Sequence, residues 1–356
     1  MGSSRDPPRK IRGPLNQKEF VQDFANYARV VFSALGSKVK HWTTFTEPHN
    51  IAATGYNIGS YAPGRSSDRR LSPEGDGSLE PWIVGHSILV AHGTVVRIYR
   101  QGFNSTGDGK IGITLNGLWP EPWNYASEQD HRACQRFLEF TVGWFADPIY
   151  FGHYPRSMIE QLGRRLPEWT SDEIALVYGS NDFFALDYYT ATFIKNREAV
   201  PEVEDYLGNV DLLPQNSQGQ NIGPETDSAW LRPCAKGLRR LLNWIHDTYN
   251  KPEIQILENG TSVKGEDDLP MEQILHDDFR CEFYRDHIME MARARVEDDI
   301  NIMGYMAWSL MDNFEWNDGF RVRFGVTYVD YHDDMKRYPK KSARLIARLF
   351  RDLVQN

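Results

Sequence analysis

The sequence has few cysteines, no long apolar run and no basic block, and each absence excludes a class of protein. Its three cysteines, Cys134, Cys234 and Cys281, include no Cys-x-x-Cys pair, which predicts free thiols and a reducing, cytoplasmic location. No apolar run reaches the about 20 residues of a membrane span, and the first ten residues lack the apolar core of a signal peptide. A net charge of −9 without a cluster of lysines or arginines argues against nucleic acid or an acidic membrane as partner.

Motifs that bind nucleotides or metals are also missing. Residues 107–112 match G-x-G-x-x-G, but they precede a predicted strand instead of opening a helix, so we do not interpret them as a dinucleotide site. His86 and His92 fall on one predicted helix, but their spacing is not the i, i+4 of a helical zinc site, which favours a packing or hydrogen-bonding role. The sequence also lacks a Walker loop, a Gly-x-Ser-x-Gly motif and a paired-cysteine metal site.

Helical and extended segments alternate along the chain, which indicates an α/β protein with a parallel sheet. The 356 residues are 40% hydrophobic and form one predicted domain, with residues 1–12 disordered. The predicted strands are 39–45, 110–116, 183–189, 254–257 and 305–310. The predicted helices are 17–35, 82–99, 133–144, 157–162, 238–250, 279–298 and 342–354. Stretches 55–81 and 207–226 are rich in glycine, proline and polar residues and are predicted to be long loops.

Two glutamates follow directly after predicted strands. An aromatic and β-branched run, Trp42–Thr46, leads into Glu47, and the run Ile254–Leu257 leads into Glu258. The carboxyl ends of parallel strands are where α/β barrels place catalytic groups. A retaining glycosidase needs one carboxylic acid and one nucleophilic carboxylate about 5 Å apart. Either glutamate alone is more simply a solvated loop residue, but the pair predicts cleavage of a glycosidic bond.

A third segment, Tyr305–Trp316, adds aromatic and acidic side chains at a strand end. It carries Trp308, Glu315 and Trp316 in or just after the last predicted strand. Indole rings stack on the apolar faces of sugars, and a carboxylate accepts hydrogen bonds from two vicinal hydroxyls. A core position explains Trp308 alone equally well, but the whole cluster favours a sugar site. Tyr189 could donate a hydrogen bond to a nearby carboxylate, although on its own a structural role is the simpler interpretation.

Together with further segments in the same order, these motifs resemble glycoside hydrolase family 1, the β-glucosidase family, and are most similar to its fungal intracellular members. The resemblance runs from about Gly13 to the C-terminus and also includes Ala62–Arg65, Glu80–His86, Trp144–Pro148 and Arg323–Val326. It implies a retaining β-glucosidase that acts on terminal non-reducing β-D-glucosyl residues of β-glucosides or cello-oligosaccharides. It implies no cofactor and no metal.

The resemblance also implies roles for individual residues. Glu47 would be the general acid/base and Glu258 the nucleophile, with Tyr189 supporting the nucleophile. The substrate-binding residues would be Thr46, Trp308, Glu315, Trp316 and Phe324. The family's phosphosugar branch carries serine where Glu315 stands, which favours an unphosphorylated glycoside.

Three positions depart from the family pattern. Thr46 stands where members usually carry an asparagine that contacts the sugar 2-hydroxyl, and Leu257 stands where they carry threonine. Asp187 stands where they carry the asparagine of an Asn-x-Tyr segment, and so adds a negative charge near the site. An additional carboxylate is expected to raise the pKa values of its neighbours.

The family fold is an eight-stranded (β/α) barrel, and the resemblance begins at the helix before its fourth strand. We therefore expect a partial barrel of strands four to eight with their helices, lacking the first three βα units. With those units the chain would lack the family's glucose-binding Gln, the Arg that pairs with the nucleophile and the His-Trp pair that lines the glucose subsite. Five strands cannot close a barrel of normal shear. The alternative function is therefore a catalytically impaired remnant that binds a sugar or a partner, and a second alternative is assembly with a partner chain. The sequence indicates neither the oligomeric state nor the natural aglycone.

Overall fold

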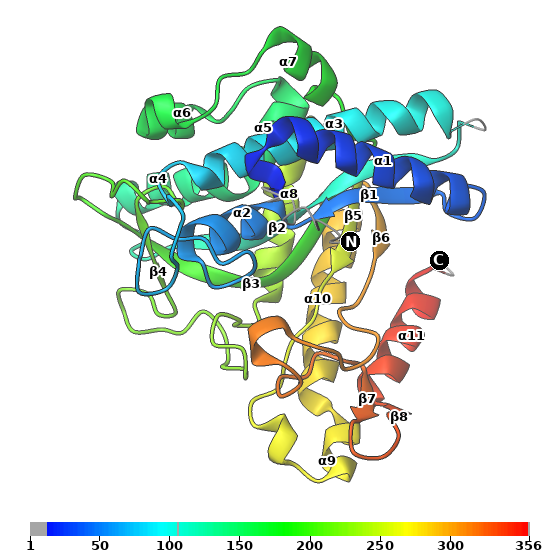
Figure 1. Ribbon diagram of the computed structural model, residues 1–356. Helices are drawn as coiled ribbons and strands as arrows, with labels where there is room; N and C mark the ends of the chain where they lie inside the picture. Colours follow the sequence, from blue (N-terminus) through cyan, green and yellow to red (C-terminus); the bar gives the residue numbers. More distant parts are fainter. Residues whose placement is uncertain (1–12, 105–106, 355–356) are drawn as a thin grey trace, which may run out of the picture.

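The computed structural model describes residues 13–104 and 107–354. The predicted disorder of residues 1–12 lies outside them. Five parallel strands form the centre of the molecule: β1 (His41–Thr46), β2 (Lys110–Pro122), β3 (Phe184–Asn196), β5 (Ile254–Glu258) and β6 (Ile302–Tyr305). They lie side by side in that order (Figure 1), and each neighbouring pair is parallel. The predicted α/β class with a parallel sheet is therefore confirmed.

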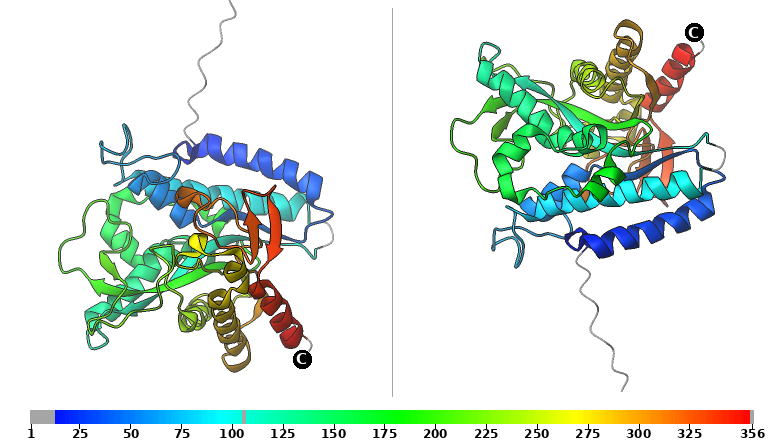
Figure 2. Two further views of the ribbon diagram at one scale, coloured as in Figure 1. Left: turned by 90° about the horizontal axis from the view of Figure 1, so that it is seen from below. Right: turned by 90° about the horizontal axis from the view of Figure 1, so that it is seen from above.

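Helices connect successive parallel strands, because such strands need crossover connections. The long helices are α1 (Gln17–Leu35), α3 (Glu80–Gly102), α8 (Ala235–Thr248), α10 (Asp278–Glu297) and α11 (Lys341–Val354). The shorter ones are α2 (Pro48–Ala53), α4 (Glu128–Leu138), α5 (Trp144–Phe151), α6 (Arg156–Leu162), α7 (Ser171–Val177) and α9 (Met271–His276). In Figure 2, α1 lies beside α3 and α10 lies beside α11, and both pairs are in contact. None of the helices in residues 13–104 and 107–354 combines the length and apolarity needed to cross a bilayer.

Helix α1 has the predicted bounds but buries a different face. The residues that pack inward are Ala25, Ala28 and Phe32, whereas Tyr27 of the predicted apolar stripe is 62% exposed. Phe32 packs against the rings of Trp42 and Tyr99. The small alanines allow α1 to lie close to α3, so close packing determines the buried face more than the apolar count does.

The main core fills the space between the sheet and the helices and is rich in aromatic side chains. Trp82 of α3 and Trp144 of α5 are fully buried, with their ring centroids 4.7 Å apart. A Cβ atom on Gly85 would lie 2.5 Å from the Trp144 indole, so only glycine allows this approach.

The sheet differs from the prediction at three strands. β2 continues to Pro122 instead of ending at residue 116. β3 continues to Asn196, and its extension pairs with the antiparallel strand β4 (Val210–Leu213), which lies in a predicted loop. β6 shares only Tyr305 with the predicted strand 305–310, because it begins at Ile302 and ends at Tyr305. The reason is that the chain leaves the sheet there: the backbone N–H of Trp308 donates to the carbonyl of Asn259, and that of Ser309 donates to the carbonyl of Phe324. Within the described residues, no ladder joins β6 to β1.

A buried ion network fixes the loops below the carboxyl end of β5. Arg280 of α10 and Lys340 are both fully buried and both bond Glu266, each at 2.7 Å. Arg280 also donates to the carbonyl of Thr261, three residues after Glu258. The hairpin of β7 (Thr327–Asp330) and β8 (Lys336–Pro339), which the sequence did not predict, leads into Lys340. The network therefore ties the segment after Glu258 to α10 and to this hairpin.

Candidate active site

Three carboxylates meet at the carboxyl ends of the strands. Glu47 directly follows β1, Asp187 lies in β3 and Glu258 is the last residue of β5. One carboxylate oxygen of each residue lies within 4.8 Å of those of the other two. Asp187 and Glu258 are also register partners on adjacent strands. The sheet therefore brings together the two glutamates that the sequence singled out, with a third carboxylate beside them.

The position of Glu47 follows from the way β1 ends. Pro48 begins α2, and Glu47 is the left-handed residue before it, with φ of 51°. Its backbone N–H still donates to Thr114 of β2, at 2.9 Å. Asn50 of α2 donates to Oε2 of Glu47 at 2.5 Å and accepts from Asn116 of β2 at 3.2 Å. Strand, turn and helix thus hold this carboxylate from three sides.

The position of Glu258 depends on the Asn-Gly pair that follows it. Asn259 donates to the carbonyl of Tyr188 and accepts from the hydroxyl of Tyr305, both at 2.7 Å, so it links β5 to both neighbouring strands. A Cβ atom on Gly260 would lie 1.7 Å from the carbonyl oxygen of Trp308, which explains why glycine is needed there. Tyr189 donates from its hydroxyl to Oε2 of Glu258 at 2.6 Å, a contact that the family resemblance implied.

Burial and mutual repulsion raise the pKa values of the site carboxyls. Burial, followed by the charge of Glu258, raises the pKa of Glu47 to about 7. The hydrogen bond from Asn50 acts in the opposite direction and lowers this pKa. Burial raises the pKa of Glu258, and the hydrogen bond from Tyr189 opposes this shift. Burial and the charges of Glu258 and Glu47 raise the pKa of Asp187 to about 10. All three groups thus favour the protonated form more than in water.

Asp187 therefore differs from the expectation that its charge would raise the pKa values of its neighbours. It is 1% exposed, and neither of its carboxylate oxygens has a hydrogen-bond partner among the described residues. Because it is so deeply buried, its pKa is raised strongly and it retains its proton near neutral pH. A neutral Asp187 exerts little repulsion on Glu47 or Glu258 while those two groups titrate.

The other predicted sugar-binding residues lie around this cluster in different degrees of burial. Glu315 is half-buried, and burial, followed by the charges of Asp318 and Glu258, raises its pKa to about 7. Trp308 is half-buried and packs on a cluster that contains Phe324. Trp316 is 65% exposed, so it belongs to the rim.

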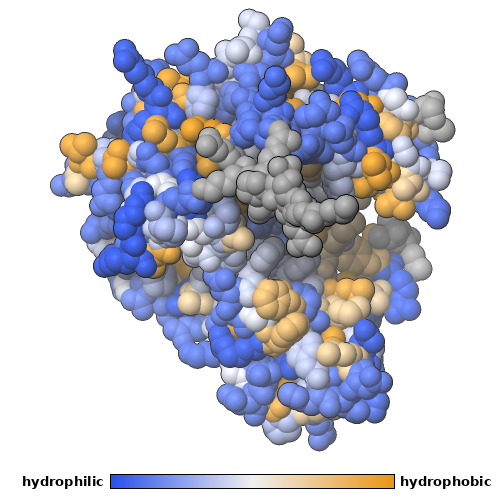
Figure 3. Space-filling model, viewed as in Figure 1, coloured by the Kyte–Doolittle hydropathy of each residue, from blue (hydrophilic) through white to orange (hydrophobic). Residues whose placement is uncertain are grey.

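Exposed apolar side chains gather in the segment that carries this rim. They are Met306, Leu310, Phe314, Trp316 and Phe320. Figure 3 shows apolar patches on an otherwise mainly hydrophilic face, viewed as in Figure 1. Such a mixture of apolar surface and carboxylates suits a ligand that has both hydroxyls and apolar C–H faces.

Phe324 and Thr46, two predicted substrate-binding residues, differ sharply in burial. Phe324 is 2% exposed and packs with its ring edge-on to Tyr189, at a centroid distance of 6.1 Å. This packing leaves almost no surface of Phe324 for a ligand, so the predicted substrate contact is replaced by a supporting contact with Tyr189. Thr46 is the exposed last residue of β1.

Sequence reasoning missed two polar residues of the site. Asn50 was not considered, although a polar side chain one turn into a helix that follows a strand-end glutamate is a usable signal. Tyr61 was also missed; its ring lies edge-on to Trp316 at 6.0 Å, and burial and the charges of Glu315, Asp318 and Glu47 raise its pKa. It directly precedes the Ala62–Arg65 motif in the sequence.

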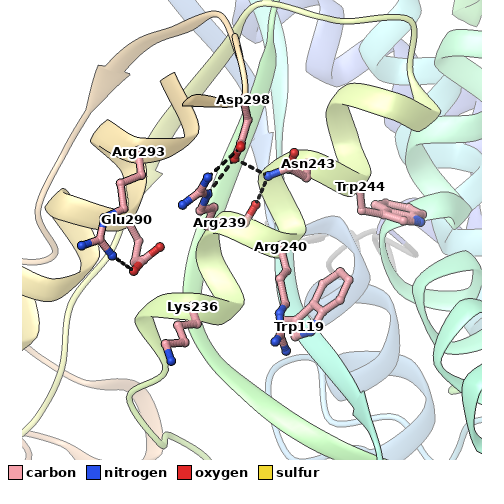
Figure 4. A pocket seen from close by; sticks show the side chains of 9 residues that line it. All are labelled: Trp119, Lys236, Arg239, Arg240, Asn243, Trp244, Glu290, Arg293 and Asp298. Atoms are coloured by element: carbon pink, nitrogen blue, oxygen red, sulfur yellow. Dashed lines mark hydrogen bonds and ion pairs between the residues drawn. The ribbon is translucent and has the colours of Figure 1, made fainter. Parts of the chain in front are cut away.

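A hollow of about 650 Å³ lies between α8 and α10, apart from the three carboxylates. Figure 4 shows its lining, in which Arg239 bonds Asp298 at 2.7 Å and Arg293 bonds Glu290 at 2.6 Å. These ion pairs satisfy most of its charges. The hollow therefore offers no arrangement of free acid and base groups for glycoside chemistry.

The features that the sequence dismissed have structural roles. His86 bonds the hydroxyl of Tyr154, and His92 bonds that of Thr44, both at 2.7 Å. The glycine-rich residues 107–112 run into β2 rather than into a helix. The two histidines thus have the hydrogen-bonding role that the sequence favoured, and the glycine-rich segment precedes a strand as predicted.

Comparison with known proteins decides the family. The family model described as glycosyl hydrolase family 1 matches residues 8–353. The chain belongs to glycosyl hydrolase family 1. Beta-glucosidase 1B of Phanerodontia chrysosporium is 47% identical over 95% of this chain and 61% of its own length. Beta-glucosidase 24 of Oryza sativa subsp. japonica is 41% identical over 91% of this chain and 65% of its own length. The chain thus spans less than two thirds of the length of these family-1 relatives.

Solved structures of family 1 superpose closely on the chain. A GH1 beta-glucosidase from Humicola insolens, in complex with glucose, gives a TM-score of 0.95 at 55% identity and covers 96% of this chain and 72% of its own. Beta-glucosidase 2 of Trichoderma reesei, in complex with Tris, gives a TM-score of 0.92 at 53% identity and covers 97% of this chain and 72% of its own.

Membership of family 1 corrects one part of the sequence prediction. The prediction that the chain lacks three N-terminal βα units is not borne out by the family match, which extends over nearly the whole chain. The comparisons also give no support for a partial barrel as a distinct fold, since the neighbours are family-1 β-glucosidases. Five successive parallel strands are common to an open sheet and to an arc of a barrel, so the alternating pattern of the sequence could not distinguish these architectures.

Proposed function

We propose that this chain is a retaining β-glucosidase, which hydrolyses terminal non-reducing β-D-glucosyl residues of β-glucosides or cello-oligosaccharides. The observation that carries the proposal is the approach of Glu47 and Glu258 to within 4.8 Å, from the ends of two different strands. Retaining glycosidases hold their carboxyls about 5–5.5 Å apart, whereas inverting ones leave about 6.5–9.5 Å for a water molecule. The separation here favours the retaining geometry.

In the first step, the carboxylate of Glu258 attacks the anomeric carbon as the bond to the aglycone oxygen breaks. Glu47 donates its proton to that oxygen, and a glucosyl ester on Glu258 results. A pKa of about 7 for Glu47 means that a large share of its carboxyl groups carry this proton near neutral pH.

In the second step, Glu47 acts as the base. Esterification removes the charge of Glu258, which is one of the causes that raise the pKa of Glu47, so Glu47 becomes a stronger acid and is ionised. It then takes a proton from water, whose oxygen attacks the anomeric carbon and releases Glu258. Two displacements return the sugar in the β configuration.

The surrounding residues position the reactants. Tyr189 orients Glu258 and favours its ionised form through the 2.6 Å hydrogen bond. We assign the sugar hydroxyls to Glu315 and Thr46, the ring face to Trp308, and the rim of the site to Trp316. The complexes of family-1 structures with glucose and with glucoimidazole support a glucoside as the ligand. We assign no natural aglycone.

The remaining sequence predictions stay predictions. We propose that residues 1–356 act as one catalytic domain, without a cofactor, in the cytoplasm. The alternative of a catalytically impaired, sugar-binding remnant has support only from the departures at Thr46, Leu257 and Asp187. No finding from the comparisons favours it.

Turnover of a chromogenic aryl β-glucoside by the purified chain tests the proposal. We expect turnover to fall at least about 10³-fold in Glu47→Ala and in Glu258→Ala, and to stay unchanged in Glu272→Ala, which removes an exposed glutamate of α9. Azide should restore turnover of Glu47→Ala and give the β-configured glucosyl azide, because azide replaces the water that needs a base. A parent chain that binds glucose but shows no turnover would identify the remnant instead.

A further inference from the structure

The hollow between α8 and α10 has no part in the proposed hydrolysis, but its lining is suited to a ligand. Trp119 of β2, several residues of the two helices and Asp298 line it (Figure 4), and Arg239 and Asp298 neutralise each other there. α8 packs on β2 and β3 in the middle of the sheet, so the hollow involves neither edge strand, β1 nor β6. Its volume of about 650 Å³ lies within the range of small-molecule sites, about 300–1,000 Å³.

Two basic side chains of the hollow are exposed, whereas the acidic side chains that pair with them are buried. The side chain of Arg293 in α10 is 49% exposed, and that of its partner Glu290 only 11%. The side chain of Arg240 in α8 is 51% exposed, and that of its partner Glu121 only 8%. The carboxylates thus lie deeper than the guanidinium groups. A ligand that enters the hollow therefore meets mainly positive charge.

Both guanidinium groups keep N–H donors for a ligand. Arg293 bonds Glu290 through Nη1 at 2.6 Å, and Arg240 contacts Glu121 through Nη1 as well. Within the part of the chain that the structure describes, neither group has a further hydrogen-bond partner. A guanidinium offers five N–H donors in a planar fork, which matches the oxygens of a phosphate.

Lys236 adds a third cation, at an unfavourable place for its own helix. It is exposed in the first turn of α8, which contains no acidic residue, and Cys234 before the helix provides no side-chain cap. The free N–H groups at a helix N-terminus carry partial positive charge, which disfavours a lysine there. Among residues 13–104 and 107–354, no carboxylate forms an ion pair with Lys236. A bound anion would compensate both the lysine and the helix end.

Two indole rings line the same hollow. Nε1 of Trp119 donates to Glu121 at 2.9 Å, and Nε1 of Trp244 donates to Gln135 at 3.2 Å, so both half-buried rings are held in place. An indole face offers apolar surface against which a sugar or a base can stack. The lining therefore suits a ligand that carries a ring as well as negative charge.

We propose that this hollow binds a phosphate monoester of a small ring compound, either a nucleoside or a sugar. Lys236, Arg240 and Arg293 hold the phosphate group, and Trp119 and Trp244 contact the ring. A phosphate monoester carries about −1.5 to −2 charges and three acceptor oxygens, one for each cation. A carboxylate, with one charge and two oxygens, matches the three cations less well. None of these residues is assigned to glucoside hydrolysis, so the two proposals can fail separately.

Calorimetric titration of the purified chain at low salt tests the site, with adenosine 5′-monophosphate and glucose 6-phosphate as the probes. We expect one saturable site that depends on Lys236, and the ester that loses more affinity in Lys236→Glu identifies the ring. This variant should weaken binding at least about tenfold, because repulsion replaces a charge-assisted hydrogen bond. Lys18→Glu is the matched control, since Lys18 is also an exposed lysine in the first turn of a helix, α1. It changes the net charge equally and should leave the affinity unchanged.

Thermal unfolding without ligand shows whether each variant is folded. An acidic residue suits the first turn of a helix, so Lys236→Glu should unfold at the same temperature as the parent or higher. Lys236→Gln, which only removes the charge, provides a second test and should also weaken the ester. Equal affinities of the parent and both Lys236 variants for the two esters would overturn the proposal. Absence of saturable binding in the parent would overturn it as well, and so would adenosine that binds as tightly as its monophosphate.

Discussion

The hydroxyl of Tyr189 in β3 donates a 2.6 Å hydrogen bond to Oε2 of Glu258 at the end of β5. The ring of Tyr189 is itself fixed edge-on against Phe324 and Trp230, at centroid distances of 6.1 and 5.7 Å. The bond lowers the pKa of Glu258, against the effect of burial, which raises it. Tyr189 therefore favours the ionised form that a nucleophile needs.

Replacement of Tyr189 by phenylalanine should weaken catalysis most strongly at low pH. Without the donor, the pKa of Glu258 rises, so protonation of Glu258 begins to abolish activity at a higher pH than in the parent. A hydrogen bond to a charged group contributes about 1.5–3 kcal/mol, so kcat/KM should fall about 10- to 100-fold. The pH profile of kcat/KM for an aryl β-glucoside measures both effects.

The exposed Tyr178 provides the matched control, because Tyr178→Phe removes a phenol that lies away from the site. Its profile should coincide with that of the parent. A uniform loss in Tyr189→Phe at every pH, without movement of the acidic limb, would contradict the proposed effect on Glu258.

Replacement of Asp187 by asparagine should stabilise the chain increasingly as the pH rises. The pKa of Asp187 is about 10 in the folded state and ordinarily 3.8, so the folded state binds more protons between about pH 4 and 10. Asp187 therefore lowers the stability of the parent as the pH rises through this range, whereas asparagine does not titrate. The gain in unfolding free energy should be at least about 1.4 kcal/mol larger at pH 9 than at pH 5. Urea unfolding at both pH values measures it; an equal gain at the two would refute the shift.

Much of the fold was predictable because local patterns determine it. Helix α1 has the predicted bounds, since a long amphipathic segment fixes its own secondary structure. β4 and the end of β6 were not predictable in the same way. β4 forms because β3 extends beyond its predicted end and offers a free edge, and β6 ends because the backbone of Trp308 bonds Asn259 instead of continuing the ladder. Both depend on contacts distant in sequence.

In the site, too, local features were predictable from the sequence, whereas features that depend on distant contacts were not. The strand-end positions of Glu47 and Glu258 are readable in the sequence, and so is the additional charge of Asp187. The burial of Asp187, and hence the raised pKa of its carboxyl, depends on side chains from several elements. The hydrogen bond from Asn50 requires the left-handed turn at Glu47, and no short motif in the sequence predicted this turn.

Replacement of Thr46 by asparagine should raise activity. Thr46 is exposed at the end of β1, directly before Glu47, and its hydroxyl is shorter than an amide. An asparagine there can reach the sugar 2-hydroxyl, and this contact strengthens in the transition state. One added hydrogen bond should increase kcat/KM about tenfold.

A 2-deoxyglucoside provides the decisive control for this variant. It lacks the hydroxyl that the amide would contact, so Thr46→Asn should give no gain on it. Thr43→Asn, at another exposed position of β1, should have no effect on either substrate. An equal gain on both sugars would show that the change acts on the strand and not on the 2-hydroxyl.

Removal of Glu266 should destabilise the chain strongly although Glu266 lies outside the site. Burial acts to raise its pKa, but the charges of Arg280 and Lys340 hold that pKa below its ordinary value. In Glu266→Ala these two fully buried cations lose their shared partner, although Asp277 still pairs with Arg280 and Asp312 lies 3.6 Å from Lys340. A buried charge left without any partner costs about 3–5 kcal/mol, so the loss should approach that range without exceeding it. The urea midpoint at pH 7 should fall accordingly, whereas Glu272→Ala should change the unfolding free energy by less than about 0.5 kcal/mol. Because salt screens buried ion pairs only weakly, the loss of unfolding free energy should persist at about 0.5 M salt. At that ionic strength, ion pairs on the surface contribute little. A loss that disappears with salt would place the network at the surface.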